Sequence, residues 1–280
     1  MIHPVNVDLH CHSTISDGAL SPTNVVLRAA ANGVDVLALT DHDELAGLAE
    51  AAEAAATCRL RFVPGVEISV SWSGTAIHIV GLNIDANHSA LVENLEYVRS
   101  CRRRRAEKIA ANLAKIGIDD ALVGAHSYAA RPYLVGRTQF ARYLVARGYG
   151  SDVANVFKEY FAPGKPGYVP HQYAMLPDVV KSIKDSGGRA VVAHPGRYKL
   201  PPLELCRLFT EFKQAGGEGI EVVTGSHTRD QYAEFARLAR EFEFTASRGS
   251  DFHGPDMSPI DLGGMPSLPE DLKPVWHDWK

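Results

Sequence analysis

Short apolar runs alternate with helical patterns near both ends of the chain. The apolar runs are typical of buried strands and lie at residues 5–9, 34–39, 60–63, 76–82, 189–193, 219–223 and 244–246. Helical patterns separate most of them, at residues 22–32, 44–56, 178–185, 203–214 and 230–241. Ser73 and Gly74 instead join the third and fourth runs by a tight turn. Seven strands in this order predict an α/β fold with a closed or nearly closed parallel barrel.

The middle of the chain, residues 87–176, has a different pattern. A long helical stripe runs from Leu91 to Leu113, a second helix follows Gly136, and a third precedes a run rich in proline and glycine at residues 162–167. We therefore expect a small helical domain inserted between the fourth and fifth strands. The barrel itself would consist of residues 1–86 and 177–280.

The composition is that of a globular chain. Of the 280 residues, 45% are hydrophobic, and a net charge of -4 with a pI near 6.3 argues against a surface that coats nucleic acid. No signal-peptide pattern opens the chain, and no run approaches the roughly 18 apolar residues of a membrane span. We therefore expect a soluble cytoplasmic protein with no membrane partner. The four cysteines are scattered, which indicates neither a disulfide framework nor a zinc knuckle.

Histidine and carboxylate side chains gather at the predicted strands. His10 and His12 follow the first strand two residues apart, so they point to the same side and can bind one cation. Residues of ligand type also lie on or directly after five other strands, namely His42, Glu67, His78, His194, Asp251 and His253. Because the C-terminal ends of barrel strands meet at one mouth, this placement predicts a common metal centre.

Four consecutive arginines lie in the first helix of the insertion. They are Arg102, Arg103, Arg104 and Arg105, and of these Arg102 and Arg105 share one helix face. A solvent-exposed helix face is the ordinary explanation of such a run. However, guanidinium groups bind phosphate through paired hydrogen bonds, and an otherwise acidic chain concentrates cations here. We therefore expect this face to bind a phosphate group.

Several motifs together resemble the PHP family of metal-dependent phosphoesterases. They are Asp-Leu-His-Cys-His-Ser from Asp8, Asp17-Gly18, Thr-Asp-His-Asp from Thr40, Pro-Gly-Val-Glu-Ile-Ser from Pro64, His-Ile-Val-Gly from His78, Ala-His-Pro from Ala193 and Gly-Ser-Asp-Phe-His-Gly from Gly249. The insertion, with its Arg-x-x-Arg helix, Gly136-Arg137 and Gly167-Tyr168-Val169-Pro170, is similar to the TrpH-like branch. The resemblance implies a distorted (β/α)7 barrel with an inserted small helical domain.

The resemblance also implies three metal ions per chain. The expected ligand sets are His10, His12, Glu67 and Asp251 for the first ion, Glu67, His78 and His194 for the second, and Asp17, His42 and His253 for the third. Many family members have histidine in place of Asp17, so we expect this carboxylate to favour a harder ion and to weaken the third site. Mixed imidazole and carboxylate ligation suits Mn²⁺, Fe and Zn, and we expect Mn²⁺.

The chemistry implied is phosphoester hydrolysis by a hydroxide that bridges two metal ions. The expected catalytic residues are Glu67, Asp251, His194 and His227, with His227 as the candidate that protonates the leaving oxygen. The four arginines and Arg137 would bind a second phosphate group. The resemblance thus implies a phosphoric monoester hydrolase that removes the 3′ phosphate from nucleoside 3′,5′-bisphosphates, such as adenosine 3′,5′-bisphosphate.

Three alternatives stay open at this point. The same site could serve a 5′ to 3′ exoribonuclease that acts on short RNA, because only the leaving group differs. A histidinol-phosphate phosphatase is a second alternative within the family, which the arginine-rich insertion disfavours. A noncatalytic metallomodule that binds nucleotides or a polymerase is the third. The expected partners are a small nucleotide substrate or short RNA, without a stable nucleic-acid complex.

Overall fold

The structure, a computed structural model, describes residues 5–129, 131 and 134–279. The chain forms two compact units. We call them the barrel unit, residues 1–95 and 174–280, and the helical unit, residues 96–173. The expected insertion, residues 87–176, includes the whole helical unit and a few residues on either side.

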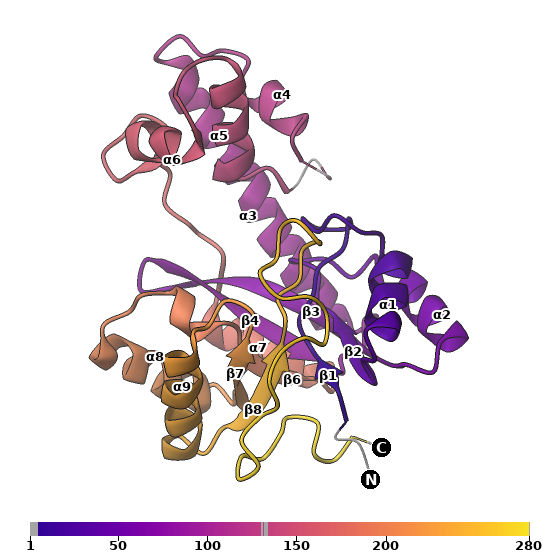
Figure 1. Cartoon of the computed structure of the whole chain (residues 1–280). Coiled ribbons are helices and arrows are strands. Elements are labelled where there is room, and N and C mark those ends of the chain that lie inside the picture. The colour runs from indigo at the N-terminus through magenta and orange to yellow at the C-terminus, as the bar shows by residue number, and fades with distance from the viewer. Residues whose placement is uncertain (1–4, 130, 132–133, 280) are drawn as a thin grey trace. The chain divides into compact units, whose positions relative to one another are not determined.

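The barrel unit is built on one eight-stranded sheet. Seven strands follow each other in the order β1 (Val7–Asp8), β2 (Val36–Leu39), β3 (Arg61–Trp72), β4 (Thr75–Leu82), β6 (Arg189–Val192), β7 (Gly219–Thr224) and β8 (Thr245–Gly249), and β5 (Ala174–Met175) pairs with β3. The two ends of this order meet, because the amide of Leu9 donates to the carbonyl of Arg248 at 3.0 Å. The predicted α/β fold with a nearly closed barrel is confirmed (Figure 1).

The expectation that all strands run parallel is wrong for β4. This strand is antiparallel to both β3 and β6. The turn before it explains the difference, because Ser73 and Gly74 both have positive φ angles, 45° and 78°, as a two-residue hairpin requires. The strand β3 is also longer than predicted, so Glu67 lies inside it rather than after it. The metal-ligand candidates of β3 and β4 are therefore placed by cross-strand pairing rather than by strand ends.

The helices predicted for the barrel unit are all present. They are α1 (Pro22–Ala31), α2 (Leu48–Thr57), α7 (Leu176–Asp185), α8 (Pro202–Gln214) and α9 (Arg229–Glu241). The hydroxyl of Ser21 caps α1 by accepting from the amide of Asn24 at 3.2 Å. The helix α2 begins four residues later than predicted, because the amide of Asp43 donates to the carbonyl of Glu67 at 2.8 Å and holds the preceding segment against β3.

Apolar side chains, mostly from the strands and the residues next to them, fill the interior of the barrel unit. This core contains Val7, Leu9, Val36, Ala38, Val63, Val80, Leu82, Val191, Ala193 and Val275. No helix among the described residues is long and apolar enough to cross a membrane.

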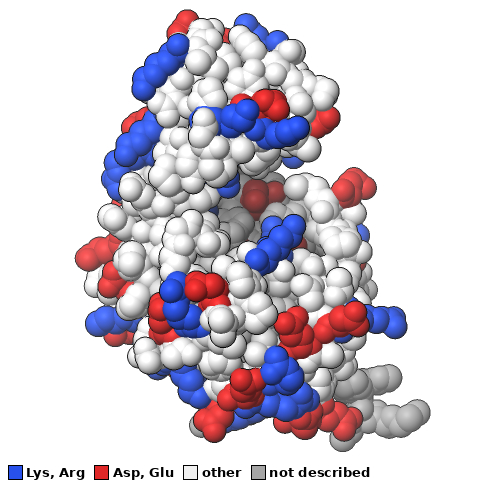
Figure 2. Space-filling view, turned by 90° about the vertical axis from the view of Figure 1, so that its left-hand side faces the viewer, with Lys and Arg blue, Asp and Glu red and all other residues white. Residues whose placement is uncertain are grey.

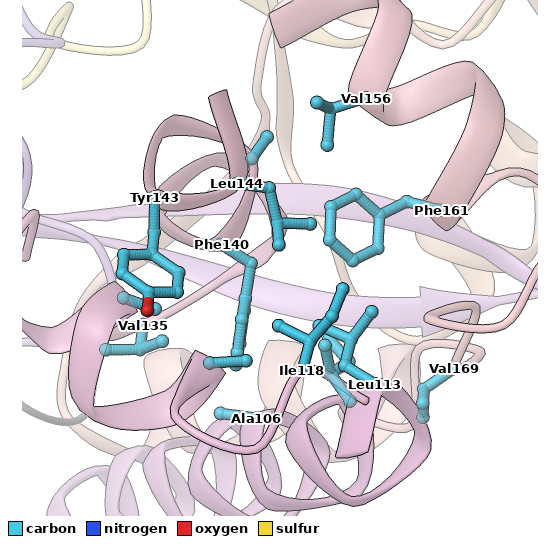
Figure 3. Close-up of a cluster of buried hydrophobic side chains, with 14 residues drawn as sticks. Ala106, Leu113, Ile118, Val135, Phe140, Tyr143, Leu144, Val156, Phe161 and Val169 are labelled. Carbon is cyan, nitrogen blue, oxygen red and sulfur yellow. The ribbon is translucent and has the colours of Figure 1, made fainter. Parts of the chain in front are cut away.

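The helical unit has a hydrophobic core of its own. Its helices are α3 (Ser89–Ala114), which begins in the barrel unit, α4 (Ala121–His126), α5 (Arg137–Ala146), α6 (Val153–Val156) and the π-helical turn Phe157–Phe161. Leu113, Phe140, Leu144 and Phe161 lie fully buried in its core (Figure 3). The helix α4 was not expected from the sequence, since six residues are too few to display a periodic apolar stripe.

Candidate metal centre

The structure brings all nine predicted ligands together. His10 and His12 follow β1, His42 follows β2, and His194 follows β6. Asp251 and His253 follow β8, Asp17 lies in the loop after β1, and Glu67 and His78 extend from β3 and β4. Their side chains form four overlapping groups within which the ligand atoms lie no more than 4.8 Å apart, namely His10, His12 and Asp251; His10, Glu67 and His194; His42, Glu67 and His78; and His12, Asp17, His42 and His253.

The innermost group joins His10, His12, Glu67 and Asp251. The Nε2 atoms of the two histidines are 3.1 Å apart. Each lies 3.3 Å from Glu67 Oε2, and they lie 3.5 and 3.3 Å from Asp251 Oδ1. Both carboxylate oxygens are buried and accept no hydrogen bond from any described residue. A cation at the middle of atoms spaced this way would be about 2 Å from each, which is the usual metal-ligand distance. The residues therefore fit a metal ion.

Glu67 connects this group to a second one. Its other oxygen, Oε1, lies 2.8 Å from Nδ1 of His78 and 2.9 Å from Nε2 of His194. A carboxylate whose two oxygens face two sets of imidazoles has the geometry of a bridging ligand. The family resemblance implies a bridging position for Glu67, and that role stays a prediction.

A third group surrounds Asp17. Its carboxylate lies 3.4 Å from Nε2 of His253, 3.8 Å from Nε2 of His42 and 3.9 Å from Nδ1 of His12. His12 was not expected in this group. The side chain of Asp17 is 45% exposed, whereas that of Glu67 is fully buried, so the third group is the more open one.

Comparison with known proteins gives the family. The PHP domain family matches residues 8–140. The chain is also 48% identical to a 3′,5′-nucleoside bisphosphate phosphatase of Chromobacterium violaceum, over 98% of the chain and 96% of that protein. The chain belongs to the PHP domain family. This outcome confirms the resemblance seen in the sequence motifs.

Two further comparisons extend this finding. This PHP-family chain is 44% identical to a 5′-3′ exoribonuclease of Haemophilus influenzae, over 96% of the chain and 97% of the relative. Among solved structures it is similar to an amidohydrolase from Chromobacterium violaceum with bound sulfate and no metal. That comparison has a TM-score of 0.87 at 48% identity and covers 97% of this chain and 95% of the other.

Burial and neighbouring charges shift the pKa values of the PHP-family site in both directions. Burial lowers the pKa of His10, but the charges of Glu221 and Glu67 raise it well above its usual value. Burial alone would raise the pKa of Glu67, yet the imidazoles of His42, His78 and His10 hold it well below its usual range. Asp251 is likewise buried and has a lowered pKa because of His10 and His12. Burial lowers the pKa of His12 to about 3. The two carboxylates are thus ionised and His12 is neutral at pH 7, as metal ligation requires.

Two supporting carboxylates were missed by the sequence analysis. Glu221, buried in β7, accepts from Nδ1 of His10 at 2.7 Å and from the amide of His194 at 2.6 Å. Asp8, buried in β1, accepts from the amide of Ser250 at 2.8 Å. Glu221 fixes the tautomer of His10 so that its Nε2 faces the innermost group. The signal available in the sequence was an acidic residue inside an apolar strand.

The backbone around the site is strained at two of the ligands. His194 and Asp251 have φ angles of 28° and 55°, which non-glycine residues rarely adopt and which cost about 1–3 kcal/mol each. A close approach also requires Gly249, because a Cβ there would lie 2.3 Å from Cβ of His10. The packing of β1, β6 and β8 therefore keeps the backbone at the site in conformations that these residues would not adopt by local preference.

His227 lies beside the site and does not point to the ligands. Its Nε2 accepts from the amide of Gly196 at 3.0 Å, and its Nδ1 lies 3.3 Å from the carbonyl of Val222. The ring stacks on Phe235 at 4.6 Å, and burial lowers its pKa to about 4. Both ring nitrogens are engaged with backbone groups, so in this arrangement His227 holds the loop after His194.

One arginine near the ligands was not expected. Nη1 of Arg197, in the short turn after His194, lies 2.9 Å from Oδ2 of Asp251. Half of its side chain is exposed. Arg197 thus brings a solvent-accessible positive charge next to the innermost group.

The predicted arginines of the helical unit divide into two sets. The guanidinium of Arg102 lies 5.2 Å from the Tyr173 ring centroid, and Nη2 of Arg137 lies 3.1 Å from Nε2 of His171. Arg105 is buried, and its pKa is lowered by burial and by the charges of Arg137 and Arg102. These three arginines therefore form one cluster of positive charge within the helical unit.

The other two arginines of the run lie on a different face of α3. Arg103 forms an ion pair with Glu96 at 2.8 Å, and Arg104 donates to the hydroxyl of Ser100 at 2.9 Å. Both side chains are exposed. Their environment is that of an ordinary solvated helix face.

Proposed function

We propose that this protein is a metal-dependent phosphomonoesterase that removes the 3′ phosphate from nucleoside 3′,5′-bisphosphates. The observation that carries the proposal is the buried innermost group, His10, His12, Glu67 and Asp251, whose donor atoms converge at 3.1–3.5 Å. Bound metal ions supply positive charge to the phosphate oxygens and ionise water near neutral pH. The bisphosphate substrate is supported by the 48% identical relative from Chromobacterium violaceum.

The proposed site holds three ions, with Mn²⁺ as the physiological metal. The innermost group would hold the first, Glu67, His78 and His194 the second, and Asp17, His42, His253 and His12 the third. Imidazole and carboxylate ligands in this mixture suit Mn²⁺ and would also bind Fe or Zn. The open position of Asp17 makes the third ion the most weakly bound in this proposal.

In this proposal the chain's own residues orient and neutralise the reacting groups. Glu67, Asp251 and His194 are the catalytic residues that hold the reaction centre, and Glu221 keeps His10 in the required tautomer. The positive charge of Arg197 beside Asp251 is placed to attract the anionic substrate. We assign His227 to holding Gly196 rather than to proton transfer, since both of its nitrogens are engaged.

The arginine cluster of the helical unit is the proposed site for the phosphate that does not react. Arg102, Arg105 and Arg137 present guanidinium groups of the kind that bind phosphate in pairs. Nη2 of Arg105 is buried and has no acceptor among the described residues, so an anion would complete its hydrogen bonding. We do not include Arg103 and Arg104, because their neighbours are Glu96 and Ser100.

A second candidate function is 5′ to 3′ hydrolysis of short RNA, supported by the 44% identical exoribonuclease of Haemophilus influenzae. The arginine cluster would then hold the 5′ phosphate of the RNA.

Histidinol phosphate carries only one phosphate group, so a histidinol-phosphate phosphatase would give the arginine cluster no role. A complete and buried ligand set disfavours a noncatalytic metallomodule. A nucleotide or short-RNA substrate is consistent with a cytoplasmic location.

A substrate comparison tests the proposal. Protein stripped with a chelator and reloaded with Mn²⁺ would be assayed on adenosine 3′,5′-bisphosphate, a 3′-mononucleotide, a 5′-phosphorylated dinucleotide and histidinol phosphate. We expect the fastest phosphate release from the bisphosphate, with the 5′-mononucleotide as product. Faster cleavage of the dinucleotide would favour the exoribonuclease. No hydrolysis of any phosphoester by metal-loaded protein would refute an enzymatic role.

A further inference from the structure

The hydroxyl group of Tyr198 lies between the strands β4 and β6, just beyond the end of their antiparallel ladder. The last paired residues are Ile79 and Val192, so the next rung would join His78 to Ala193. One bond of that rung is direct, since the amide of Ala193 donates to the carbonyl of His78 at 3.1 Å. In a regular antiparallel rung, a return bond would run from the amide of His78 to the carbonyl of Ala193.

The phenol hydroxyl takes the place of that return bond. The amide of His78 donates to the Tyr198 hydroxyl at 2.9 Å, and the hydroxyl donates to the carbonyl of Ala193 at 2.7 Å. Both backbone groups are therefore satisfied, but through an oxygen atom inserted between the strands. The separation of β4 and β6 at this rung is thus set by a side chain rather than by the sheet alone.

This rung lies at one of the proposed metal groups. His78 is itself a candidate ligand, and Ala193 directly precedes the candidate ligand His194. Nδ1 of His78 and Nε2 of His194 lie 2.8 and 2.9 Å from the same oxygen of Glu67, with 5.3 Å between the two ring centroids. The Tyr198 ring also contacts the ring of His194 edge-on, at 5.6 Å between centroids. A change in the spacing of β4 and β6 would therefore move the two imidazoles relative to each other.

We propose that Tyr198 is a positioning residue for the second metal ion, because its hydroxyl fixes the spacing at which His78 and His194 can bind one cation. The inference rests on the metal site of the proposed function and adds to it a residue that acts through the main chain of two ligands. Loss of a group that orients metal ligands typically costs about 10- to 100-fold in metal affinity. We expect an effect of the same size from loss of this hydroxyl.

The test measures metal binding apart from hydrolysis. Chelator-stripped, full-length protein would be titrated with Mn²⁺ against a chelating dye, which gives the number of ions bound and the affinity of each. Tyr198→Phe removes one oxygen atom and keeps the ring. In this variant one ion should bind about 10- to 100-fold more weakly, while the other ions keep their wild-type affinity.

The matched control is Tyr232→Phe. It removes a hydroxyl of the same unit that donates to the carbonyl of Thr224, a residue that is not a candidate ligand, at 3.2 Å. This variant should bind every ion as the wild type does.

A second background separates positioning from general stability. In His78→Ala protein the main chain at residue 78 is kept, so Tyr198→Phe should still lower the melting temperature of the metal-free protein. Its effect on metal affinity should disappear, because the second group has already lost a ligand.

Three results would overturn the proposal. They are wild-type metal affinities in Tyr198→Phe, an equal loss in Tyr232→Phe, and an undiminished loss of affinity in the His78→Ala background. Wild-type protein that shows the expected metal pattern yet hydrolyses no phosphoester would refute the proposed function and leave this inference intact.

Discussion

The barrel unit and the helical unit handle charge in opposite ways. The barrel unit contains 16 Lys and Arg against 27 Asp and Glu, a net charge of -11, whereas the helical unit has 13 against 6, a net charge of +7. The overall charge of -4 conceals this division. On the face seen in Figure 2, basic side chains lie at several places on the helical unit, with acidic ones beside some of them. Net charge of the whole chain is therefore a poor guide to its ligands.

The interiors of the two units differ as well. The barrel unit buries several ionisable residues, among them His10, His12, Glu67, His194 and Glu221. Among the described residues of the helical unit, Arg105 is the one buried charged side chain, and the rest of its core is apolar. Burying ionisable groups is costly unless they are paired or bind metal. The barrel unit thus carries that cost at its candidate metal ligands, while the helical unit has an apolar core and carries most of its cations at the surface.

The strongest test of this contrast is Glu67→Ala. Glu67 is a buried anion that faces two groups of imidazoles, so its loss should remove more than one metal equivalent. Turnover should fall by more than the roughly 10- to 100-fold typical of residues that only hydrogen-bond to metal ligands. Elemental analysis and a phosphate-release assay would measure both effects. Full metal occupancy in this variant would contradict the bridging role. Glu96→Ala, an acidic substitution on the surface of the helical unit, should leave metal content unchanged.

The arginine cluster provides the next largest effect. Arg102→Ala should lower kcat/KM for adenosine 3′,5′-bisphosphate about ten- to hundredfold, since a hydrogen bond to a charged group contributes about 1.5–3 kcal/mol. Hydrolysis of a 3′-mononucleotide should barely change, because that substrate has no 5′ phosphate to bind. The neighbouring Arg103→Ala, paired with Glu96, is the control and should affect neither substrate. Equal losses on both substrates would instead assign Arg102 to the reacting phosphate.

Glu221→Gln tests whether a residue that only holds a metal ligand in place also affects metal affinity. The amide keeps the shape of the side chain but no longer enforces the tautomer of His10, so metal affinity should fall about 10- to 100-fold while the fold is retained. Competition with a chelating dye would measure the affinity. Glu218→Gln, at the partly exposed edge before β7, is the matched control. Wild-type affinity in Glu221→Gln would show that packing alone orients His10.

The last prediction concerns stability rather than activity, in the metal-free protein at low pH. His227 has a pKa of about 4 in the folded state against 6.5 when unfolded, so the unfolded chain binds the extra proton between these values. The preference of the folded state for neutral His227 contributes to the free energy of unfolding above pH 6.5. This contribution, up to about 3 kcal/mol, is lost as the pH falls toward 4. Thermal melts of wild type and His227→Gln over this range would measure it. The variant should lose less stability than wild type over this range, and an equal loss would contradict the prediction.

Much of the site could be predicted from the sequence because ligand side chains follow strands. The alternation of strands and helices placed His10, His42, His194 and Asp251 just after the ends of four of the strands, and barrel geometry brings such points together. The three-residue spacing likewise predicted that Arg102 and Arg105 share a face. These inferences required only local periodicity and a general rule of the fold.

The remaining features depended on which residues meet across the fold. The direction of β4 and the interior position of Glu67 follow from the hairpin turn at Ser73 and Gly74. Whether a carboxylate in an apolar strand faces the ligands, as Glu221 does, depends on strand register. The separation of Arg102 and Arg105 from Arg103 and Arg104 likewise needed the segment that packs against α3.

The sequence by itself determined the family, the barrel and the residues able to bind metal, because these are set by residue type and spacing along the chain. Only the tertiary structure decided which atoms face one another. The convergence of His10, His12, Glu67 and Asp251 at 3.1–3.5 Å arises from contacts between strands up to 241 residues apart, counting from His10 to Asp251. Distances of that kind are fixed by register, twist and packing, and no local pattern in a single sequence encodes them.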